Sequence, residues 1–141
     1  MKRMLVASVI TLSSICFSDT PFLCPSPDSI QAVPATHPYP PSPGFNYVAV
    51  DEAGVSFQSV NSIIGNAVPP IVSFDGASFF AVGTGRAHCL YRDGKGGMQT
   101  LIAKISGNVL RYEGSAWTQD PIAPFYDCNS HTRNDCTFMR S

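Results

Sequence analysis

The cysteines constrain the fold of this chain more than any other feature. Cys16 aside, four remain, at Cys24, Cys89, Cys128 and Cys136. In an exported chain an even number of cysteines predicts a disulfide framework. Four cysteines allow three pairings, and the short, turn-prone spacing favours Cys128 with Cys136, which leaves Cys24 with Cys89. The chain-entropy model gives about 2.5 kcal/mol for the short loop and about 4.5 kcal/mol for the long one.

The N-terminus predicts export. Lys2 and Arg3 precede an apolar segment that runs to about Ile15 and ends in small residues, the order typical of a signal peptide. The segment is too short to span a bilayer, which needs about 20 apolar residues. We expect residues 1–18 to be removed after Ser18, giving a secreted or periplasmic protein. The alternative, a buried N-terminal helix, would leave two charges at an uncapped start.

Cys16 raises a second alternative, a bacterial lipoprotein anchored through that thiol. The residue before a lipidated cysteine is normally small, but here it is Ile15. Three residues before the cysteine stands Ser13 in place of a large aliphatic residue. The sequence therefore favours a soluble exported chain over a lipidated one.

Composition limits the partners of the mature chain. Removal of residues 1–18 leaves 123 of 141 residues, with 7 Lys and Arg against 10 Asp and Glu. This length fits one domain, and a net negative charge gives no electrostatic footprint for nucleic acid. No second long apolar segment is present, so we expect no membrane span.

The arrangement of short segments predicts an all-β protein. Residues 19–44 are proline-rich and predict an extended, polyproline-like lead-in, held to the body by Cys24. Residues 45–141 contain short runs rich in Val, Ile, Phe and Tyr, separated by turn residues. We expect a small antiparallel β-sandwich or partly open barrel of about seven short strands, with a C-terminal disulfide loop.

Glycine-containing turns predict how these runs connect. "HCLYRDGKGGMQTLIAKI" and "TLIAKISGNVLRYEG" are typical of hairpins, and "DEAG" and "FDGA" are typical of turns. Within "GVSFQSV", alternation predicts that Val55, Phe57 and Val60 face inward and that Ser56 and Gln58 face outward.

The stretch "CNSHTRNDC" is also a candidate metal site. Cys128, His131 and Cys136 could bind zinc together with Asp127 or Asp135. A second closely spaced cysteine pair is missing, and an oxidising compartment favours the disulfide. We therefore expect no metal and no cofactor.

A catalytic function has little support in the sequence. There is no Gly-x-Ser-x-Gly motif, and the nearest serine, Ser78 in "DGASFF", lies within a strand-like run. A secreted hydrolase acting on carbohydrate or peptidoglycan remains the second hypothesis, with His131, Glu113 or Asp127 in its site. No catalytic residue is assigned.

Binding is the first functional hypothesis. Recognition usually occurs on loops of a rigid β scaffold. We expect a secreted, non-enzymatic binding or effector protein that contacts a protein or glycan through "RDGKGG" and "NSHTRND", with Lys95, His131 and Arg133 as binding residues. Trp117, with Tyr112, could form a carbohydrate platform. A periplasmic or surface structural factor is the third hypothesis, and the sequence does not specify the oligomeric state.

Three short motifs together resemble a known group. They are "CPSPDSI" with Cys24 and Pro25, "CLYRD" with Cys89 and Tyr91, and "SAWTQDP" with Trp117. The chain is similar in these positions to small uncharacterised exported proteins of gamma-proteobacteria, including Legionella-like bacteria. The resemblance implies a bacterial origin and no known catalytic residues.

Overall fold

The computed structural model describes residues 19–38, 41–60, 63–65, 67–80 and 85–141, so the predicted signal peptide and Cys16 lie outside the described residues. The protein is all-β, as predicted, with twelve strands in the described ranges instead of about seven. No helix in these ranges has the length and apolar character needed to cross a membrane. The strands are β1 (Thr20–Phe22), β2 (Gln31–Pro38), β3 (Pro41–Val50), β4 (Ser56–Ser59), β5 (Ile63–Ile64), β6 (Ile71–Phe80), β7 (Arg86–Asp93), β8 (Met98–Lys104), β9 (Val109–Arg111), β10 (Thr118–Gln119), β11 (Phe125–Cys128) and β12 (Phe138–Arg140), with short 3₁₀ helices η1 (Pro27–Ser29) and η2 (Arg133–Cys136).

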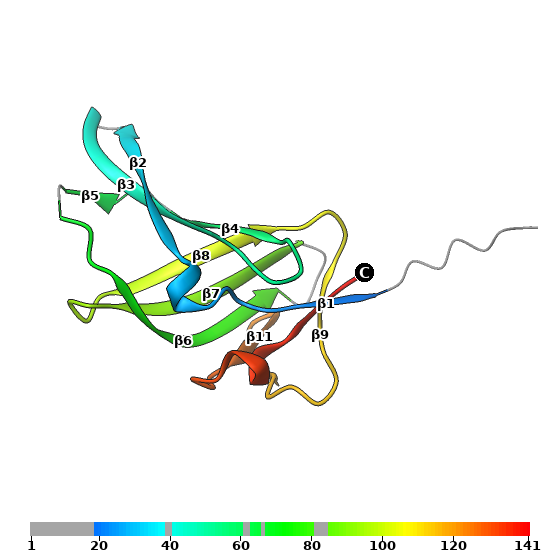
Figure 1. Ribbon diagram of the computed structural model, residues 1–141. Coiled ribbons are helices and arrows are strands. Elements are labelled where there is room, and N and C mark those ends of the chain that lie inside the picture. The colour runs from blue at the N-terminus through cyan, green and yellow to red at the C-terminus, as the bar shows by residue number, and fades with distance from the viewer. Residues whose placement is uncertain (1–18, 39–40, 61–62, 66, 81–84) are drawn as a thin grey trace, which may run out of the picture.

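The strands form two antiparallel sheets (Figure 1). The large sheet has the order β10-β11-β6-β7-β8-β4-β3-β2, with β5 paired to β3, and the small sheet has the order β1-β12-β9. The predicted β7–β8 hairpin is confirmed. The predicted hairpin between β8 and β9 is wrong, because β9 pairs with β12. Both edges of β8 are already occupied by β7 and β4, so β8 has no free edge for β9.

The expected turn at "FDGA" is a bulge within a single strand. β6 runs through this stretch and shifts its register against β7 between Phe74 and Gly76. Gly76 has φ +128°, and a Cβ atom there would lie 2.7 Å from the Cys128 carbonyl oxygen. A side chain is therefore excluded both by backbone conformation and by space.

The proline-rich segment belongs to the large sheet. β2 pairs with β3 at every position from Gln31 to Pro38, and the two strands rise together above the body in Figure 1. The domain boundary expected after residue 44 therefore falls inside β3. β2 is the last strand of the sheet, and Pro34 is tolerated there because an edge strand has backbone groups that need no neighbour.

One face of the large sheet carries the core. Its side chains pack against the small sheet and the segment that leads from β1 to η1, which makes the fold sandwich-like. The Phe138 ring of β12 stacks on Phe22 of β1 at 4.9 Å and meets Phe79 of β6 at 6.0 Å. We call this side the covered face; its most buried members include Tyr47, Phe57, Phe74, Phe79, Tyr91 and Leu101.

Two disulfides hold this face, and both predicted pairings are confirmed. Cys24 is bonded to Cys89, which joins the N-terminal segment to β7. Cys128 is bonded to Cys136, which closes the C-terminal loop over η2. All four cysteines are at most 1% exposed, so the native fold shields both bonds from reductants.

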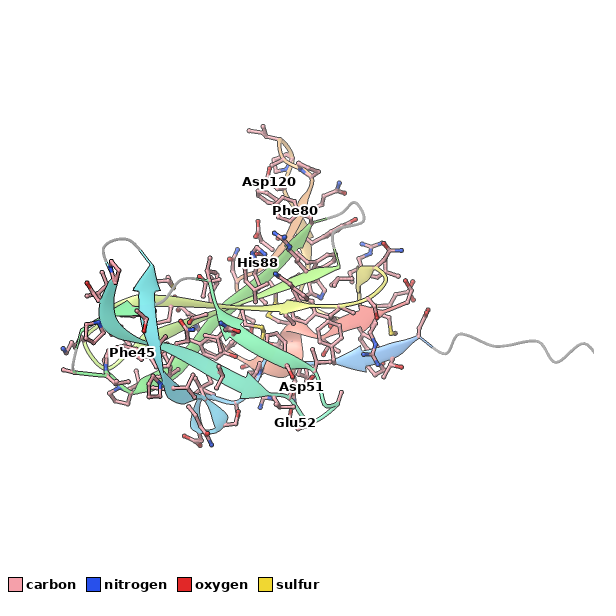
Figure 2. The ribbon with its side chains drawn as sticks, turned by 90° about the horizontal axis from the view of Figure 1, so that it is seen from above. Phe45, Asp51, Glu52, Phe80, His88 and Asp120 are labelled. Carbon is pink, nitrogen blue, oxygen red and sulfur yellow. A yellow bond between two sulfur atoms is a disulfide. The ribbon has the colours of Figure 1, made fainter. Side chains whose placement is uncertain are left out.

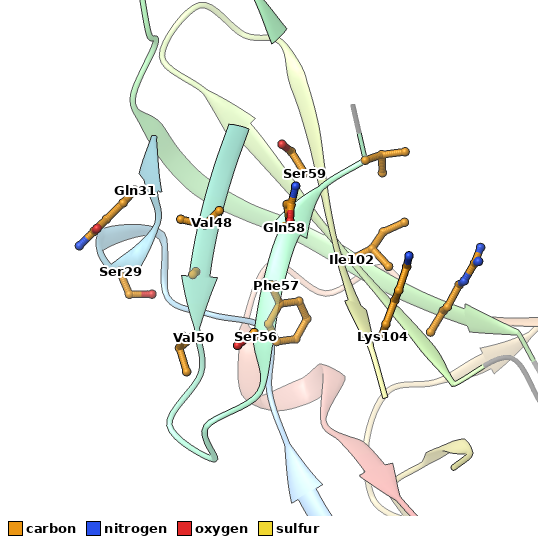
Figure 3. A pocket seen from close by; sticks show the side chains of 13 residues that line it. Ser29, Gln31, Val48, Val50, Ser56, Phe57, Gln58, Ser59, Ile102 and Lys104 are labelled. Atoms are coloured by element: carbon orange, nitrogen blue, oxygen red, sulfur yellow. The ribbon is translucent and has the colours of Figure 1, made fainter. Parts of the chain in front are cut away.

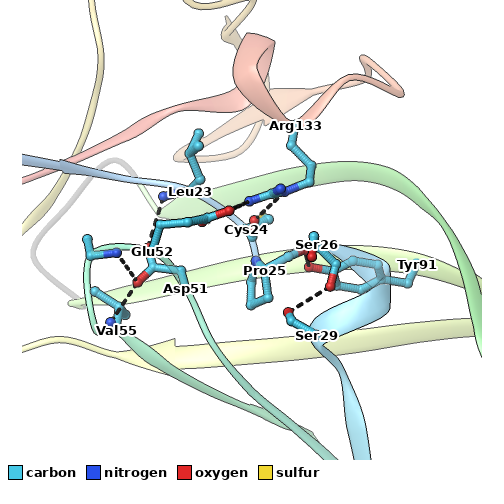
Figure 4. A network of polar contacts seen from close by, with 11 residues as sticks. Leu23, Cys24, Pro25, Ser26, Ser29, Asp51, Glu52, Val55, Tyr91 and Arg133 are labelled. Carbon is cyan, nitrogen blue, oxygen red and sulfur yellow. Dashed lines mark hydrogen bonds and ion pairs between the residues drawn. The ribbon is translucent and has the colours of Figure 1, made fainter.

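The N-terminal segment is fixed to the covered face by polar contacts as well (Figure 4). The Leu23 amide donates to Asp51 Oδ2 at 3.1 Å. The Tyr91 hydroxyl donates to the Pro25 carbonyl at 2.7 Å. The covering segment is therefore joined to the sheet at successive residues, and the buried tyrosine hydroxyl is satisfied.

The β3–β4 and β7–β8 turns use the same device, an aspartate followed three residues later by a glycine with positive φ. Asp51 and Asp93 each accept two backbone N–H bonds through Oδ1, from the second and fourth residues after them. The two aspartates differ in the partner of Oδ2. Asp51 Oδ2 accepts a hydrogen bond from the Leu23 amide, and Asp93 Oδ2 accepts one from the Gln99 side chain. The Gln99 bond and those from the turn amides hold the pKa of Asp93 below its usual range.

Candidate functional site

The second face of the large sheet is crossed by one row of directly paired residues. Residues opposite one another on neighbouring strands point to the same side of a sheet. None of the eight members is buried, and we call this side the open face. In strand order from β2 to β10, the row contains Gln31, Val48, Gln58, Ile102, His88, Ser78, Asp127 and Thr118.

A groove of about 900 Å³ lies on this face, over β2, β3, β4, β8 and the start of β7 (Figure 3). Its aliphatic lining includes Val48, Val50 and Ile102, and its charged lining consists of Arg86 and Lys104. Val50 is 55% exposed. The groove thus combines apolar side chains open to solvent with two cations, a mixture suited to binding.

A smaller depression of about 260 Å³ lies on the same face, where β6, β7 and β11 meet. The Phe80 ring meets Phe125 edge-on at 5.3 Å and His88 edge-on at 6.1 Å. Ser78 and Asp127 complete the lining. Figure 2 shows Phe80 and His88 in this region, on the Asp120 side of the molecule and away from the β3–β4 turn.

The environment of this depression disfavours charge. Burial, with a smaller contribution from Arg86, lowers the pKa of His88. Burial, followed by the nearby Asp120 carboxylate, raises the pKa of Asp127. The His88 Nε2 atom is buried and has no hydrogen-bond partner among the described residues.

These residues do not form a catalytic triad. Ser78 lies between His88 and Asp127 in the cross-strand row. A serine nucleophile instead needs a histidine in the middle position, hydrogen-bonded to both partners. Because His88 Nε2 has no partner in the described chain, it does not activate the Ser78 hydroxyl. The hydrolase hypothesis therefore gains no support from this depression.

Two of the predicted binding residues lie on loops away from both grooves. Lys95 is exposed at the tip of the β7–β8 turn. His131 has a side chain 77% exposed, with Nδ1 3.2 Å from Asp75 Oδ1. The other Asp75 oxygen accepts from Arg92 Nε at 3.0 Å, so one carboxylate joins the "NSHTRND" loop to the end of β7. Neither groove described above is lined by Lys95 or His131.

Arg133 fastens the fold together instead of presenting a free charge (Figure 4). Its Nε donates to the Cys24 carbonyl at 2.6 Å, and its Nη2 donates to both Glu52 oxygens at 2.8 and 2.9 Å. Its side chain is only 20% exposed. The guanidinium connects η2, the N-terminal segment and the β3–β4 turn, and its charge is paired with the Glu52 carboxylate of the same chain.

Trp117 belongs to the core. It is 9% exposed, its Nε1 donates to the Thr137 carbonyl at 2.7 Å, and its ring meets Phe79 edge-on at 4.9 Å. The segment around Trp117 therefore folds back onto the core. A carbohydrate platform needs an exposed ring face, and among the two aromatic residues considered, only Tyr112 is exposed.

The candidate zinc ligands are not arranged for a metal. Cys128 and Cys136 are consumed by their disulfide. Across the described ranges, no group of three or more His, Cys, Asp or Glu side chains could hold an ion.

The open face was not predicted from the sequence, although the sequence contains a signal for it. In "FNYVAV", Phe45, Tyr47 and Ala49 alternate with Asn46, Val48 and Val50, so both sets are partly apolar. An antiparallel strand with one solvated face normally alternates apolar and polar residues. Two apolar sets in one strand therefore indicate either a second covering layer or an exposed contact surface.

Comparison with known proteins identified no relative. No family model, no curated protein and no solved structure matches this chain. The two disulfides are consistent with an oxidising extracellular or periplasmic environment.

Proposed function

We propose that this is a secreted, non-catalytic binding or effector protein that contacts its partner through the open face of the large sheet. One observation carries the proposal: exposed aliphatic side chains gather in a groove on one face of a sheet whose opposite face is tightly packed. Val50 and Val60 in that groove are 55% and 53% exposed. Contiguous exposed apolar surface on a stable domain marks interaction sites more often than scattered single residues do.

The scaffold under this face is well suited to recognition. The strands that carry the groove are held from behind by the covered face, including the buried disulfide at Cys89. Binding then orders few side chains, and a site on strands is held more accurately than a site on loops. The loops "RDGKGG" and "NSHTRND", predicted from the sequence as the contact surface, are the alternative location for the binding site.

Chemical-shift mapping can separate these locations. We would titrate a ¹⁵N- and methyl-labelled sample with a panel of short peptides and oligosaccharides. We expect ligands that bind to shift the signals of Val48, Gln58 and Ile102. The change Ile102→Ser should weaken their affinity by about tenfold, because loss of an aliphatic group buried on binding costs about 1–3 kcal/mol. Lys95→Glu is the matched loop variant and should bind normally. Shifts confined to residues 93–97 and 128–136 would overturn the open-face location.

Hydrolysis is tested in the same samples. A non-catalytic protein leaves the oligosaccharides and peptides intact over days of incubation. Turnover that disappears in Ser78→Ala or Asp127→Asn would show that the smaller depression is a catalytic site.

A further inference from the structure

Two positive charges face each other on the open face. Arg86 of β7 and Lys104 of β8 are a directly opposed cross-strand pair, and both are exposed. Neither side chain makes a hydrogen bond or an ion pair with another described residue, whereas the side chains of Arg92 and Arg133 each have a carboxylate partner. Like charges directly opposite on a sheet are destabilising. The pair therefore needs an explanation outside the stability of the isolated fold.

The surroundings of this pair define what it can bind. Both cations line the large groove, and the lining residues include no Asp or Glu. Ser56 and Gln58 add hydrogen-bonding groups, while Val50 and Ile102 add aliphatic surface beside the charges. A carboxylate placed between an arginine and a lysine accepts charge-assisted hydrogen bonds from both, and the arginine can bind it in a bidentate manner.

We infer that the groove binds an acidic segment of a partner protein, with a carboxylate at Arg86 and Lys104 and aliphatic side chains along Val48, Val50 and Ile102. This inference rests on the proposed function and names the partner's chemistry. The net negative charge of the chain gives no general attraction for such a segment. Recognition would therefore depend on the local pair.

The lining favours a peptide over an acidic glycan. Sugar rings are usually held against an exposed aromatic face, and the aromatic side chain that lines this groove, Phe57, is only 2% exposed. Exposed valines and an isoleucine instead match aliphatic side chains of an extended segment. An acidic glycan and a second copy of this chain are the alternative occupants, and the experiment below tests both.

The experiment uses three synthetic peptides of the same length that carry two Leu residues beside two Glu, two Gln or two Lys. Binding is measured by NMR shifts and by isothermal titration calorimetry at low salt. We expect the Glu peptide to bind most tightly and to shift Arg86, Lys104 and Ile102 signals. Replacing Arg86→Gln and Lys104→Gln together should weaken it by about a hundredfold, or about tenfold for each charge. Lys104→Arg should retain binding, and Lys95→Glu, a charge change outside the groove, should also retain it.

Stability supplies an independent readout. Arg86→Glu turns the like-charged pair into an opposite-charged one, so we expect Tm to rise slightly while binding of the Glu peptide falls. A double change, Arg86→Glu with Lys104→Glu, should transfer the preference to the Lys peptide. These opposite changes in stability and binding would not follow from unfolding.

Several outcomes would overturn the inference. Equal affinity for the three peptides on the open face would refute the acidic preference while leaving the proposed binding face intact. Peptide shifts away from that face would refute both. Preferential binding of a sulfated heparin oligosaccharide would identify a glycan partner, and concentration-dependent dimers broken by Arg86→Glu in sedimentation would identify a second copy.

Discussion

Leu101 and Ile102 are neighbours in β8, and they lie on opposite faces of the large sheet. Leu101 is fully buried on the covered face, and Ile102 is half-exposed in the groove of the open face. The two side chains have nearly the same volume and belong to the same strand. They differ in exposure because another part of the chain covers only one face of the sheet.

The covering layer is assembled from segments distant in sequence. The stretch around Cys24 and Pro25 and the strand around Phe138 close one face, through a disulfide, a tyrosine hydrogen bond and stacked rings. The other face receives no such layer from the described residues but keeps aliphatic side chains. One face therefore accounts for stability, and the other is available for binding.

The largest expected effect comes from removing the long-range disulfide on the covered face. Cys24→Ala with Cys89→Ala should lower the free energy of unfolding by about 4.5 kcal/mol, because the closed loop spans 65 residues. Cys128→Ala with Cys136→Ala, which opens an 8-residue separation, should cost about 2.5 kcal/mol. Denaturant unfolding followed by fluorescence measures both. A larger loss for the short loop would contradict the dependence of the stabilisation on loop length.

The neighbouring pair in β8 tests the comparison directly. Leu101→Ala should cost about 2–5 kcal/mol, since it leaves a cavity in the core. Ile102→Ala removes a similar group from the open face and should cost less than about 1 kcal/mol. Urea unfolding of the two variants gives both values. Equal losses would show that the open face is covered in solution.

A smaller effect is expected from pH on the open face. The pKa of folded His88 lies below its usual value, so as pH falls below about 6.5 the unfolded chain takes up a proton before the folded chain does. Stability should therefore fall between pH 7 and pH 5. His88→Gln should make that fall shallower in thermal melts recorded across this range. Identical slopes for the two proteins would contradict the burial of the imidazole.

The smallest expected effect is at the rim of the covered face. Glu52 is 66% exposed, so Glu52→Gln should change the free energy of unfolding by less than about 0.5 kcal/mol although it breaks the ion pair with Arg133. Arg133→Gln should cost more, about 1–2 kcal/mol, because the Cys24 carbonyl also loses its donor. Thermal melts at low and high salt separate the two contributions. Equal costs would mean that the ion pair accounts for the whole effect and that the contact with the Cys24 carbonyl adds nothing measurable.

Local patterns predicted the fold class, the disulfide pairing and the turns at Asp51 and Asp93. These features depend on residues close in sequence or on cysteine chemistry. Val60 shows where the expectation departed from alternation: it was expected inward but is 53% exposed, and Ser59 takes the buried position. Strict alternation from Phe57 places Ser59 inward and Val60 outward. The buried Ser59 hydroxyl accepts a hydrogen bond from the Tyr47 amide at 3.1 Å.

Pairings between distant strands were not predictable from the sequence. β9 pairs with β12, and β12 pairs on its other edge with β1. The local turn chemistry at Gly107 therefore does not decide which strand β9 pairs with. The same limit applies to the open face. Alternation divides a strand into two sets of side chains, but it does not say which set another segment will cover.

The pairing of β1 with β12 has a consequence for how the molecule reaches its native state. Thr20 lies opposite Arg140, so the small sheet cannot assemble until nearly all of the described chain is available. Contacts with such large sequence separation form late and slow the search for the native topology. Until β12 forms, the Phe22, Phe79 and Trp117 rings lack their contact with Phe138, and this is the interval in which a chaperone would bind them.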